Sequence, residues 1–391
     1  GHGMKKKSVV VTSVMAAVLF GCSILAWTKE TDAFSDSERR ELAKFPMFSV
    51  ETMLDGSFME DFESYTLDQF PFRDLFRKLK ARIVFDVWGQ KDNNDIYIAD
   101  GYASKMEYPL SKPMLDHAAE RFFYIYETYL QNVGDIYFAI VPDKNYFLAE
   151  QNGYLSLDYE ELIGYMKEKT DYMTYIDLAE YLELEDFYFT DTHWKQENLV
   201  DVAEVMLEAM GAGDERKTTE KAENRVQKVD DNADIRNNME YQKIDLDIPF
   251  YGVYYGQAAL PMEPDRLSYL TNAMLEDCKV YSYDTGSPVE IPMYDMEKAY
   301  GKDPYEMFLS GTRPILTIKN PQVDNGEELI VFRDSFGSSL IPLLAKGYEK
   351  ITVLDIRYVN SSMLGQFVEF GSQDVLFLYS TMLLNSSLAL K

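Results

Sequence analysis

Cysteine and histidine are scarce in this chain of 391 residues, and each shortage excludes a kind of site. Only Cys22 and Cys278 occur, and Cys22 lies inside an apolar N-terminal stretch, so neither a disulfide framework nor a cysteine-based metal site is expected. Of the three histidines, His2 precedes Met4 in a Gly-His-Gly sequence that resembles a tag remnant. His193 has no second histidine nearby, which argues against a zinc hydrolase. We therefore expect no metal and no cofactor.

Positive charge is also in short supply. The chain has 38 basic and 66 acidic side chains, and its formal net charge is −28. A polyanionic partner would be repelled, so nucleic acid is excluded as a partner. Apolar residues make up 46% of the chain and aromatics 14%, as in a folded globular protein. The length allows one large domain with an insertion, or two domains. No internal repeat is visible.

The one long apolar run stands near the N-terminus. Residues 8–27 are about twenty mostly apolar residues, long enough to cross a bilayer and longer than most signal-peptide cores. The basic flank in residues 1–7 should stay in the cytoplasm and send the rest outside. Residues 19–22 resemble a lipoprotein box, but Phe20 is bulky for that motif and the apolar run continues past Cys22. An uncleaved single-pass anchor is favoured over lipidation or cleavage.

Short apolar runs alternate with helical patterns in the rest of the chain, and this predicts an α/β fold with a parallel sheet covered by helices on both faces. Residues 28–210 should hold N-terminal helices and the first part of the core, and residues 322–391 the second part. Residues 211–321 should form an inserted polar region and cap, because they are charged and then rich in Tyr, Pro and Met without a clear period. The expected strands are 135–141, 174–178, 329–332, 351–354 and 374–379, a hairpin is expected at 93–102, and helices at 72–88, 114–132, 159–169, 199–210, 338–346 and 362–370.

Ser335 is a candidate nucleophile. The apolar strand 329–332 runs into Asp334-Ser335-Phe336 and then into a short helix. A serine at the end of a buried strand is held rigidly, and the N–H groups that open the next helix can stabilise an oxyanion. The alternative is an ordinary capping feature of a strand-to-helix turn.

His193 is a candidate base because Asp191 stands two residues before it. An aspartate at this spacing can accept the Nδ1 proton and leave Nε2 free to take a proton from a serine. The alternative is an aspartate at a helix start beside a half-buried histidine.

Further polar residues follow the ends of neighbouring strands. Asp355, Arg357 and Tyr358 follow one strand, and Lys144 follows another. Ligands of open α/β sheets bind at the carboxyl edge, so Arg357, Tyr358 and Lys144 are candidates for substrate contact. A salt bridge between Asp355 and Arg357 and a surface turn at Lys144 are the alternatives.

The segment Thr190-Asp191-Thr192-His193-Trp194 resembles the signature of the DHHW family of bacterial cell-envelope proteins, with Thr192 in place of the second histidine. Four further segments stand in the order expected for that family: 68–74, 305–311, 334–336 and 355–358. The Asp-Thr-His-Trp and Asp-Ser pair is also similar to that of the periplasmic alginate O-acetyltransferases, which have an SGNH-hydrolase-like fold.

This resemblance implies a triad of Ser335, His193 and Asp191 that moves acetyl groups onto, or off, an extracellular polysaccharide. It also implies a multi-pass membrane acyltransferase as partner. Trp194 would stack on a sugar, and Arg357 and Tyr358 would line the acceptor groove. SGNH enzymes usually carry glycine where Arg333 stands, and no standard Gly/Asn oxyanion pair is present, so backbone N–H groups near Ser335 and a side chain such as Arg357 would replace it. A non-catalytic glycan-binding or scaffolding role in an envelope assembly is the alternative.

Overall fold

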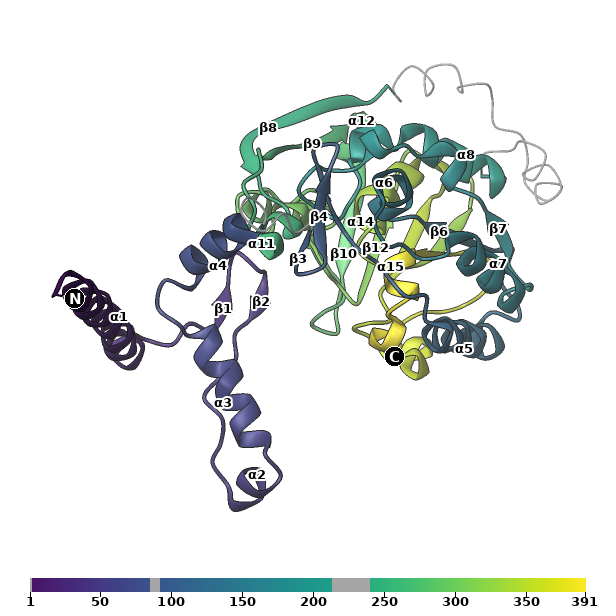
Figure 1. Cartoon of the computed structure of the whole chain (residues 1–391). Coiled ribbons are helices and arrows are strands. Elements are labelled where there is room, and N and C mark those ends of the chain that lie inside the picture. Colours follow the sequence, from purple (N-terminus) through teal and green to yellow (C-terminus); the bar gives the residue numbers. More distant parts are fainter. Residues whose placement is uncertain (1, 85–91, 213–239) are drawn as a thin grey trace, which may run out of the picture. The chain divides into compact units, whose positions relative to one another are not determined.

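The computed structural model describes residues 2–84, 92–212 and 240–391, which fall into two compact units (Figure 1). The first unit comprises residues 1–94 and 255–262, and the second comprises residues 95–254 and 263–391.

The first unit begins with the apolar helix α1 (His2–Thr28). Its segment Val9–Thr28 is 20 residues long and is long and apolar enough to cross a membrane. The unit continues with β1 (Phe34–Ser35), β2 (Arg40–Glu41), α2 (Val50–Leu54), α3 (Ser57–Asp68), α4 (Arg73–Arg82) and β3 (Asp92–Asn93). The helix expected at 72–88 is present as α4 and continues as π-helix at residues 83–84, while residues 85–91 lie outside the described residues.

The junction between α3 and α4 holds paired charges. Asp68 at the end of α3 accepts hydrogen bonds from the Arg40 guanidinium and from the Ala43 N–H, at 2.8 and 2.9 Å. Arg73 at the start of α4 is paired with Glu38 and lies 3.5 Å from Asp68. Asp68 thus joins two helices to the strand that precedes them, and the Arg40 guanidinium lowers the pKa of this carboxyl to about 2.

The second unit is built on a mixed sheet of eight strands in the order β11-β10-β12-β14-β13-β15-β6-β7. Its strands are β6 (Ile136–Val141), β7 (Thr174–Ile176), β10 (Lys279–Ser282), β11 (Val289–Ile291), β12 (Ile315–Lys319), β13 (Glu328–Arg333), β14 (Lys350–Leu354) and β15 (Asp374–Ser380). The five strands from β14 to β7 are parallel, so their carboxyl ends share one edge. The expected core strands are present.

The sheet extends further than the sequence indicated. β12 pairs antiparallel with β14, and β10 pairs antiparallel with both β12 and β11. All three strands come from the range 211–321, which was expected to form an inserted cap. The physical reason is that Val280, Leu316 and Ile318 are buried in the main core, so this part of the range is sheet. Residues 213–239 of that range lie outside the described residues.

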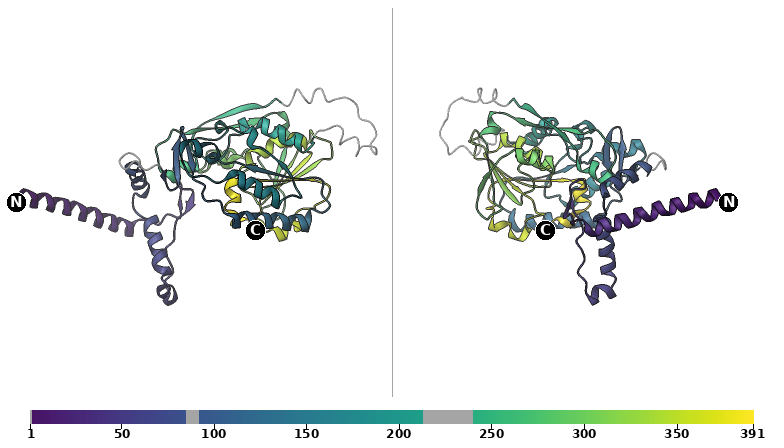
Figure 2. Two further views of the ribbon diagram at one scale, coloured as in Figure 1. Left: turned by 45° about the vertical axis from the view of Figure 1, so that its right-hand side comes forward. Right: turned by 90° about the vertical axis from the view of Figure 1, so that its left-hand side faces the viewer.

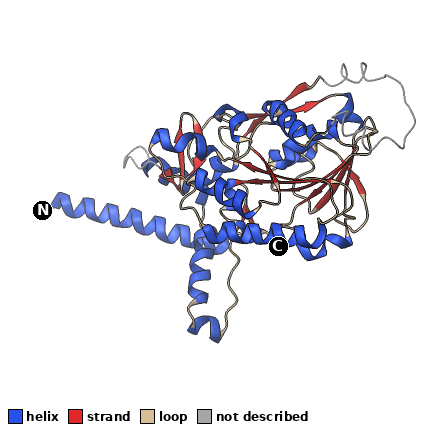
Figure 3. Cartoon of the chain, turned by 90° about the vertical axis from the view of Figure 1, so that its right-hand side faces the viewer, coloured by secondary structure: helices blue, strands red, loops and turns tan. Residues whose placement is uncertain are grey.

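Helices cover both faces of this sheet (Figures 2 and 3). Alternate side chains of β13 enter two cores: Leu329 and Val331 face one, and Ile330 and Phe332 face the other. The first core is covered by α8 (Val200–Ala209) and α14 (Gly337–Leu344), and the second by α5 (Lys112–Tyr129) and α7 (Tyr159–Lys169). This two-sided burial explains why the strands are short, continuous apolar runs.

The remaining elements of the second unit are shorter. They are β4 (Ile96–Ala99), β5 (Tyr102–Lys105), α6 (Lys144–Asn152), β8 (Gln242–Phe250), β9 (Asp265–Thr271), α12 (Ala273–Asp277), α13 (Met296–Ala299) and α15 (Thr381–Leu384). α11 (Val253–Ala258) spans the boundary between the units. β4 and β5 form the expected hairpin. The segment expected as a helix at 362–370 is a 3-10 helix, Ser361–Gln366.

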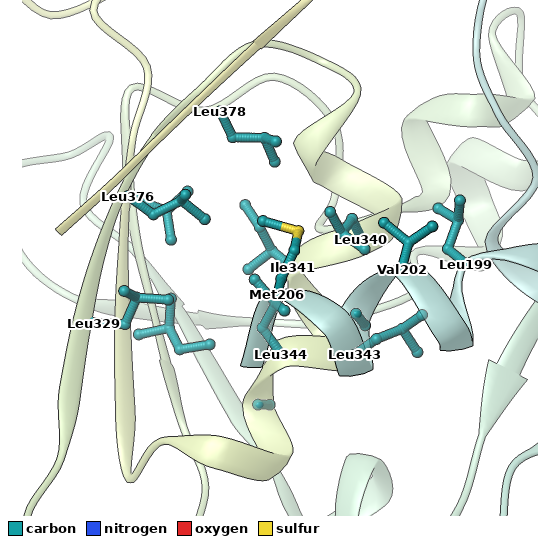
Figure 4. Packing of buried hydrophobic residues seen from close by; sticks show 14 of the residues in the cluster. Leu199, Val202, Met206, Leu329, Leu340, Ile341, Leu343, Leu344, Leu376 and Leu378 are labelled. Atoms are coloured by element: carbon teal, nitrogen blue, oxygen red, sulfur yellow. The ribbon is translucent and has the colours of Figure 1, made fainter. Parts of the chain in front are cut away.

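Helices α8 and α14 pack together on the sheet, and Figure 4 shows Val202 and Met206 of α8 beside Leu340 and Ile341 of α14. Each such buried side chain contributes roughly 1.5–3 kcal/mol to folding. α8 follows the segment that contains His193, and α14 follows Ser335. The same core therefore anchors the two helices that follow the segments from which the site is built.

Candidate functional site

Ser335 lies between the end of β13 and the start of α14, at the carboxyl edge of the sheet. Its neighbour Asp334 fixes this turn, because its carboxylate accepts hydrogen bonds from the Phe336 N–H at 3.0 Å and from the Ser380 N–H at 2.8 Å. Asp334 thereby ties the turn to the end of β15. Ser335 itself stays partly exposed.

His193 lies in a segment, residues 187–195, with almost no regular structure. Its backbone is closed by hydrogen bonds from the Tyr188 N–H to the His193 carbonyl at 3.1 Å and from the Lys195 N–H to the Asp186 carbonyl at 2.6 Å. Just beyond His193, the indole N–H of Trp194 donates to the Phe336 carbonyl at 3.0 Å. This bond fastens the segment to the helix start that follows Ser335.

Asp191, His193 and Ser335 form one hydrogen-bonded chain. The His193 Nδ1 atom lies 2.6 Å from Asp191 Oδ1, and Nε2 lies 2.8 Å from Ser335 Oγ. With the proton on Nδ1, the imidazole donates to the carboxylate and accepts from the serine hydroxyl. Asp191 is 1% exposed and His193 9%, so water competes weakly for these bonds. This is the arrangement in which a serine hydroxyl is activated by a neighbouring base.

A second oxygen of Asp191 is held by the segment that follows β8. The Val253 N–H donates to Asp191 Oδ2 at 2.9 Å. Gly252 approaches so closely that a Cβ there would lie 2.3 Å from the Asp191 Cα, so glycine is required. The range expected as a cap therefore supplies a direct contact to the carboxylate, and Asp191 is oriented at both oxygens.

Tyr305 fixes the plane of the imidazole. Its ring stacks on His193 with centroids 3.7 Å apart and an interplanar angle of 6°. Its hydroxyl lies 3.2 Å from the Ser335 carbonyl oxygen and 2.9 Å from the Ser339 hydroxyl. Burial raises the pKa of this phenol, so it remains neutral. Sequence reasoning placed Tyr305 only within a family-like segment and gave it no role.

Asp265 holds the segment before His193, and sequence reasoning missed it. Its carboxylate accepts from the N–H groups of Phe189 and Thr190 at 2.7 and 2.8 Å, and from the Thr190 hydroxyl at 2.6 Å. It is 4% exposed, and burial raises its pKa. The only sequence signal is a lone aspartate at the start of a strand, far along the chain, which does not distinguish it from other acidic residues.

Lys144 was expected at an accessible edge, and the structure corrects this. The side chain is 1% exposed, and its ammonium donates to the carbonyls of Tyr188 and Phe189 at 2.8 and 3.3 Å. Burial lowers the pKa of Lys144 to about 7. Lys144 and Asp265 thus bind the carbonyl and N–H groups of the same short segment, and Lys144 supports the site from inside.

Trp194 was expected to stack on a sugar, and this too is corrected. Its side chain is fully buried, and its ring packs edge-on against Phe336 with centroids 5.6 Å apart. Burial of the large apolar indole in the core stabilises the fold, and its N–H already donates to the Phe336 carbonyl.

Arg357 and Asp355 form the salt bridge that was one of the two interpretations. The guanidinium donates to both carboxylate oxygens, at 2.9 and 2.6 Å, and Asp355 is fully buried. Tyr358 is 55% exposed and lies beneath Arg357, with 5.5 Å from the guanidinium carbon to the ring centre. Of the four expected substrate contacts, Arg357 and Tyr358 retain exposed surface.

Arg333 stands where SGNH enzymes usually have glycine, and it is fully buried. Its Nη1 donates to the Asp334 carbonyl at 3.3 Å and lies 3.7 Å from Asp355. Its Nε and Nη2 atoms have no hydrogen-bond partner among the described residues. Within residues 2–84, 92–212 and 240–391, no group of three His, Cys, Asp or Glu side chains could hold a metal ion.

The mixed sheet, with helices on both faces and the serine at its carboxyl edge, is the α/β fold expected from the sequence and is similar to SGNH-hydrolase-like folds. The chain is similar in structure to a DHHW family protein from Eubacterium siraeum DSM 15702, with a TM-score of 0.54, 19% identity, and coverage of 74% of this chain and 91% of that one. It is likewise similar to Bacillus cereus PatB1, with a TM-score of 0.54, 17% identity, and coverage of 75% and 97%.

The O-acetyltransferase domain of Pseudomonas putida AlgJ is a more distant neighbour, with a TM-score of 0.44, 14% identity, and coverage of 74% of this chain and 92% of that one. No family model and no curated protein sequence matches the chain. The likeness to the Eubacterium siraeum protein confirms, as a likeness of fold, the resemblance to the DHHW family seen in the sequence.

Proposed function

We propose that this protein is a membrane-anchored, outward-facing acyl-transfer enzyme that acetylates or deacetylates a cell-surface polysaccharide. The observation that carries the proposal is the unbroken chain of hydrogen bonds from Asp191 through His193 to Ser335. The apolar helix α1 supports the anchor. The polysaccharide and a multi-pass membrane acyltransferase as partner rest on the sequence resemblance alone.

In the first half-reaction, Ser335 Oγ attacks the acyl carbon of the donor while His193 Nε2 takes the hydroxyl proton. The tetrahedral intermediate then collapses, the bond to the leaving group breaks, and the imidazolium returns its proton to that group. In the second half-reaction a glycan hydroxyl attacks the acyl-serine and the same imidazole moves the proton. Water in place of the hydroxyl gives hydrolysis. Asp191 stabilises the imidazolium without becoming protonated.

The oxyanion requires donors close to Ser335. The N–H groups of Phe336, Gly337 and Ser338 already donate to oxygens of Asp334 and Ser335, at 3.0 to 3.2 Å. The Ser335 N–H donates to no acceptor among the described residues, and we assign it to the oxyanion. Removing one such donor typically lowers kcat by about 10²–10³.

The test compares the full chain, in a non-ionic detergent, with Ser335→Ala for turnover of p-nitrophenyl acetate in the presence and absence of polysaccharide. Ser386→Ala, an exposed serine near the C-terminus, is the matched control. We expect turnover to be lost only in Ser335→Ala. A structure of PatB1 carries a sulfonyl adduct, so a sulfonyl fluoride should add its mass to this chain and not to Ser335→Ala.

Equal turnover by Ser335→Ala and the unchanged chain would refute the nucleophile. Polysaccharide binding that survives Ser335→Ala and His193→Ala, with no acyl transfer by the unchanged chain, would assign the protein to glycan binding or scaffolding instead.

A further inference from the structure

One face of α4 in the first unit concentrates positive charge. Arg73, Phe76, Arg77 and Lys80 are spaced by three and four residues and therefore share one side of the helix. They line a cleft of about 860 Å³ together with side chains from neighbouring segments. The other lining residues are Glu38, Arg39, Arg40, Leu67, Phe70, Asn93, Asn94 and Gln257.

The net charge of the cleft lining is opposite in sign to the net charge of the chain. The lining holds five cationic side chains and one carboxylate, in a protein whose net charge is −28. Clustering like charges is unfavourable unless counter-charges are present. The positive charge of the lining therefore requires negative groups nearby, either from the protein or from a ligand.

Internal carboxylates pair with at least three of the five cations. Arg40 donates to Asp68 at 2.8 Å, Arg73 is paired with Glu38, and Arg77 lies 3.5 Å from Glu38 and 3.6 Å from Asp74. Arg77 also donates to the carbonyls of Gly256 and Gln257, both at 3.0 Å, which fixes its guanidinium in the wall. Burial and the nearby Arg73 lower the pKa of Arg77. Lys80 has no ion-pair partner among the described residues and is exposed.

Apolar side chains stand beside these cations. Leu67 is 63% exposed, Phe70 41% and Phe76 42%. A ligand that suits both surfaces has an anionic head and an apolar body. Guanidinium groups match the oxygens of a phosphate ester in geometry as well as in charge.

We propose that this cleft binds the phosphate-ester headgroup of an anionic phospholipid. This goes beyond the acyl-transfer function and rests only on its membrane anchor. The lining begins at residue 38, ten positions after α1 ends at residue 28. A linker of that length reaches at most about 35 Å, so the cleft stays within reach of the headgroups. The positions of these cations, and not merely their number, would then decide lipid preference.

The test uses the full chain in non-ionic micelles, titrated calorimetrically with dihexanoyl phosphatidylglycerol, dihexanoyl phosphatidylcholine or inorganic phosphate. We expect phosphatidylglycerol to bind at least fivefold more tightly than the other two. Lys80→Gln should weaken this binding about fivefold, the usual effect of one cation near an anionic lipid surface. Lys78→Gln is the matched control, because Lys78 is an exposed cation of α4 outside the lining.

Equal affinity for the two lipids, or equal effects of Lys80→Gln and Lys78→Gln, would overturn the proposal. Tighter binding of inorganic phosphate than of phosphatidylglycerol would assign the cleft to a soluble phosphate compound and would also overturn it. This titration does not measure acyl transfer. Its result would therefore stand even if the proposed enzymatic function proved wrong.

Discussion

The two segments that meet at the site are held in different ways. Residues 329–339 are positioned by regular structure: a parallel strand, a short turn and a helix packed on the core. Residues 188–194 have almost no regular structure and are positioned by buried side chains, above all Asp265 and Lys144. The serine therefore depends on the sheet, whereas the imidazole depends on a few polar contacts.

This difference predicts that substitutions in the two segments have different effects on stability and activity. Changes in the buried apolar residues of 329–339 should act through core packing and lower stability together with activity. Changes around residues 188–194 should be able to misplace the imidazole while the sheet persists. Four substitutions probe the comparison.

The largest effect is expected for His193→Gln, which removes the base from the weakly structured segment. Turnover of p-nitrophenyl acetate should fall by about 10³-fold or more, since a positioned general base contributes on this scale. Thermal unfolding should change little, because glutamine fills a similar volume. His117→Gln, at the other histidine that follows the apolar helix, should keep full turnover. A drop of less than tenfold in His193→Gln would contradict the assigned role.

The next effect is expected for Asp265→Ala, which removes the acceptor of the Phe189 and Thr190 N–H groups and the 2.6 Å acceptor of the Thr190 hydroxyl. The free energy of unfolding should fall by about 2–4 kcal/mol, and turnover should fall by about 10–100-fold as the segment shifts. Urea unfolding measures the change in the free energy of unfolding, and steady-state kinetics measures the change in turnover. Asp247→Ala, on the exposed side of β8, should do neither. If both variants behave alike, Asp265 does not position the segment.

A pH-dependent effect is expected for Lys144→Met. The pKa of Lys144 is about 7 in the folded chain and near 10.5 when unfolded, so between these values the unfolded chain binds the extra proton. Stability gained from this site therefore rises with pH from about 7 to 10, by at most about 1.4 kcal/mol per pH unit.

The unfolding free energy of the unchanged chain minus that of Lys144→Met should become more positive as the pH rises from about 7 to 10. Asp143, Asp191, Asp265 and Lys195 interact with Lys144 and are present in both proteins. A constant difference from pH 7 to 9 would show that Lys144 keeps an ordinary pKa.

The smallest effect is expected for Tyr358→Ala. Because this ring is 55% exposed, the free energy of unfolding should change by no more than about 0.5 kcal/mol. If Tyr358 lines the acceptor surface, the KM for polysaccharide should rise while p-nitrophenyl acetate turnover is unchanged. Trp194→Phe serves as the contrast, since its buried indole should affect stability and leave the KM for the glycan as it is. The reverse pattern would restore Trp194 as a glycan contact.

The sequence predicted what depends on short-range pattern. An apolar run between Gly134 and Pro142 predicted β6, and an apolar run that leads into Asp334 predicted β13. The Asp191-to-His193 spacing and the family resemblance together predicted the hydrogen-bonded chain that the structure contains.

Burial and long-range polar contacts could not be predicted in this way. An exposed and a buried lysine look alike in a sequence, so Lys144 was assigned to the surface. Trp194 was assigned to a ligand because its direction depends on the fold. Asp265 acts on residues 75 positions away, and nothing near it marks that contact. The three strands of the main sheet that lie within 211–321 lacked a clear period because β10, β11 and β12 are only three to five residues long.

The position of β15 sets the order in which the site can come into existence during synthesis. This strand is the last of the sheet in the chain, yet it lies between β13 and β6. During synthesis, His193 and later Ser335 are therefore made before β15, the strand that joins β6 to β13. A stop after residue 373 should leave both side chains present but produce an aggregation-prone polypeptide, because β6 and β13 would each offer an unpaired edge.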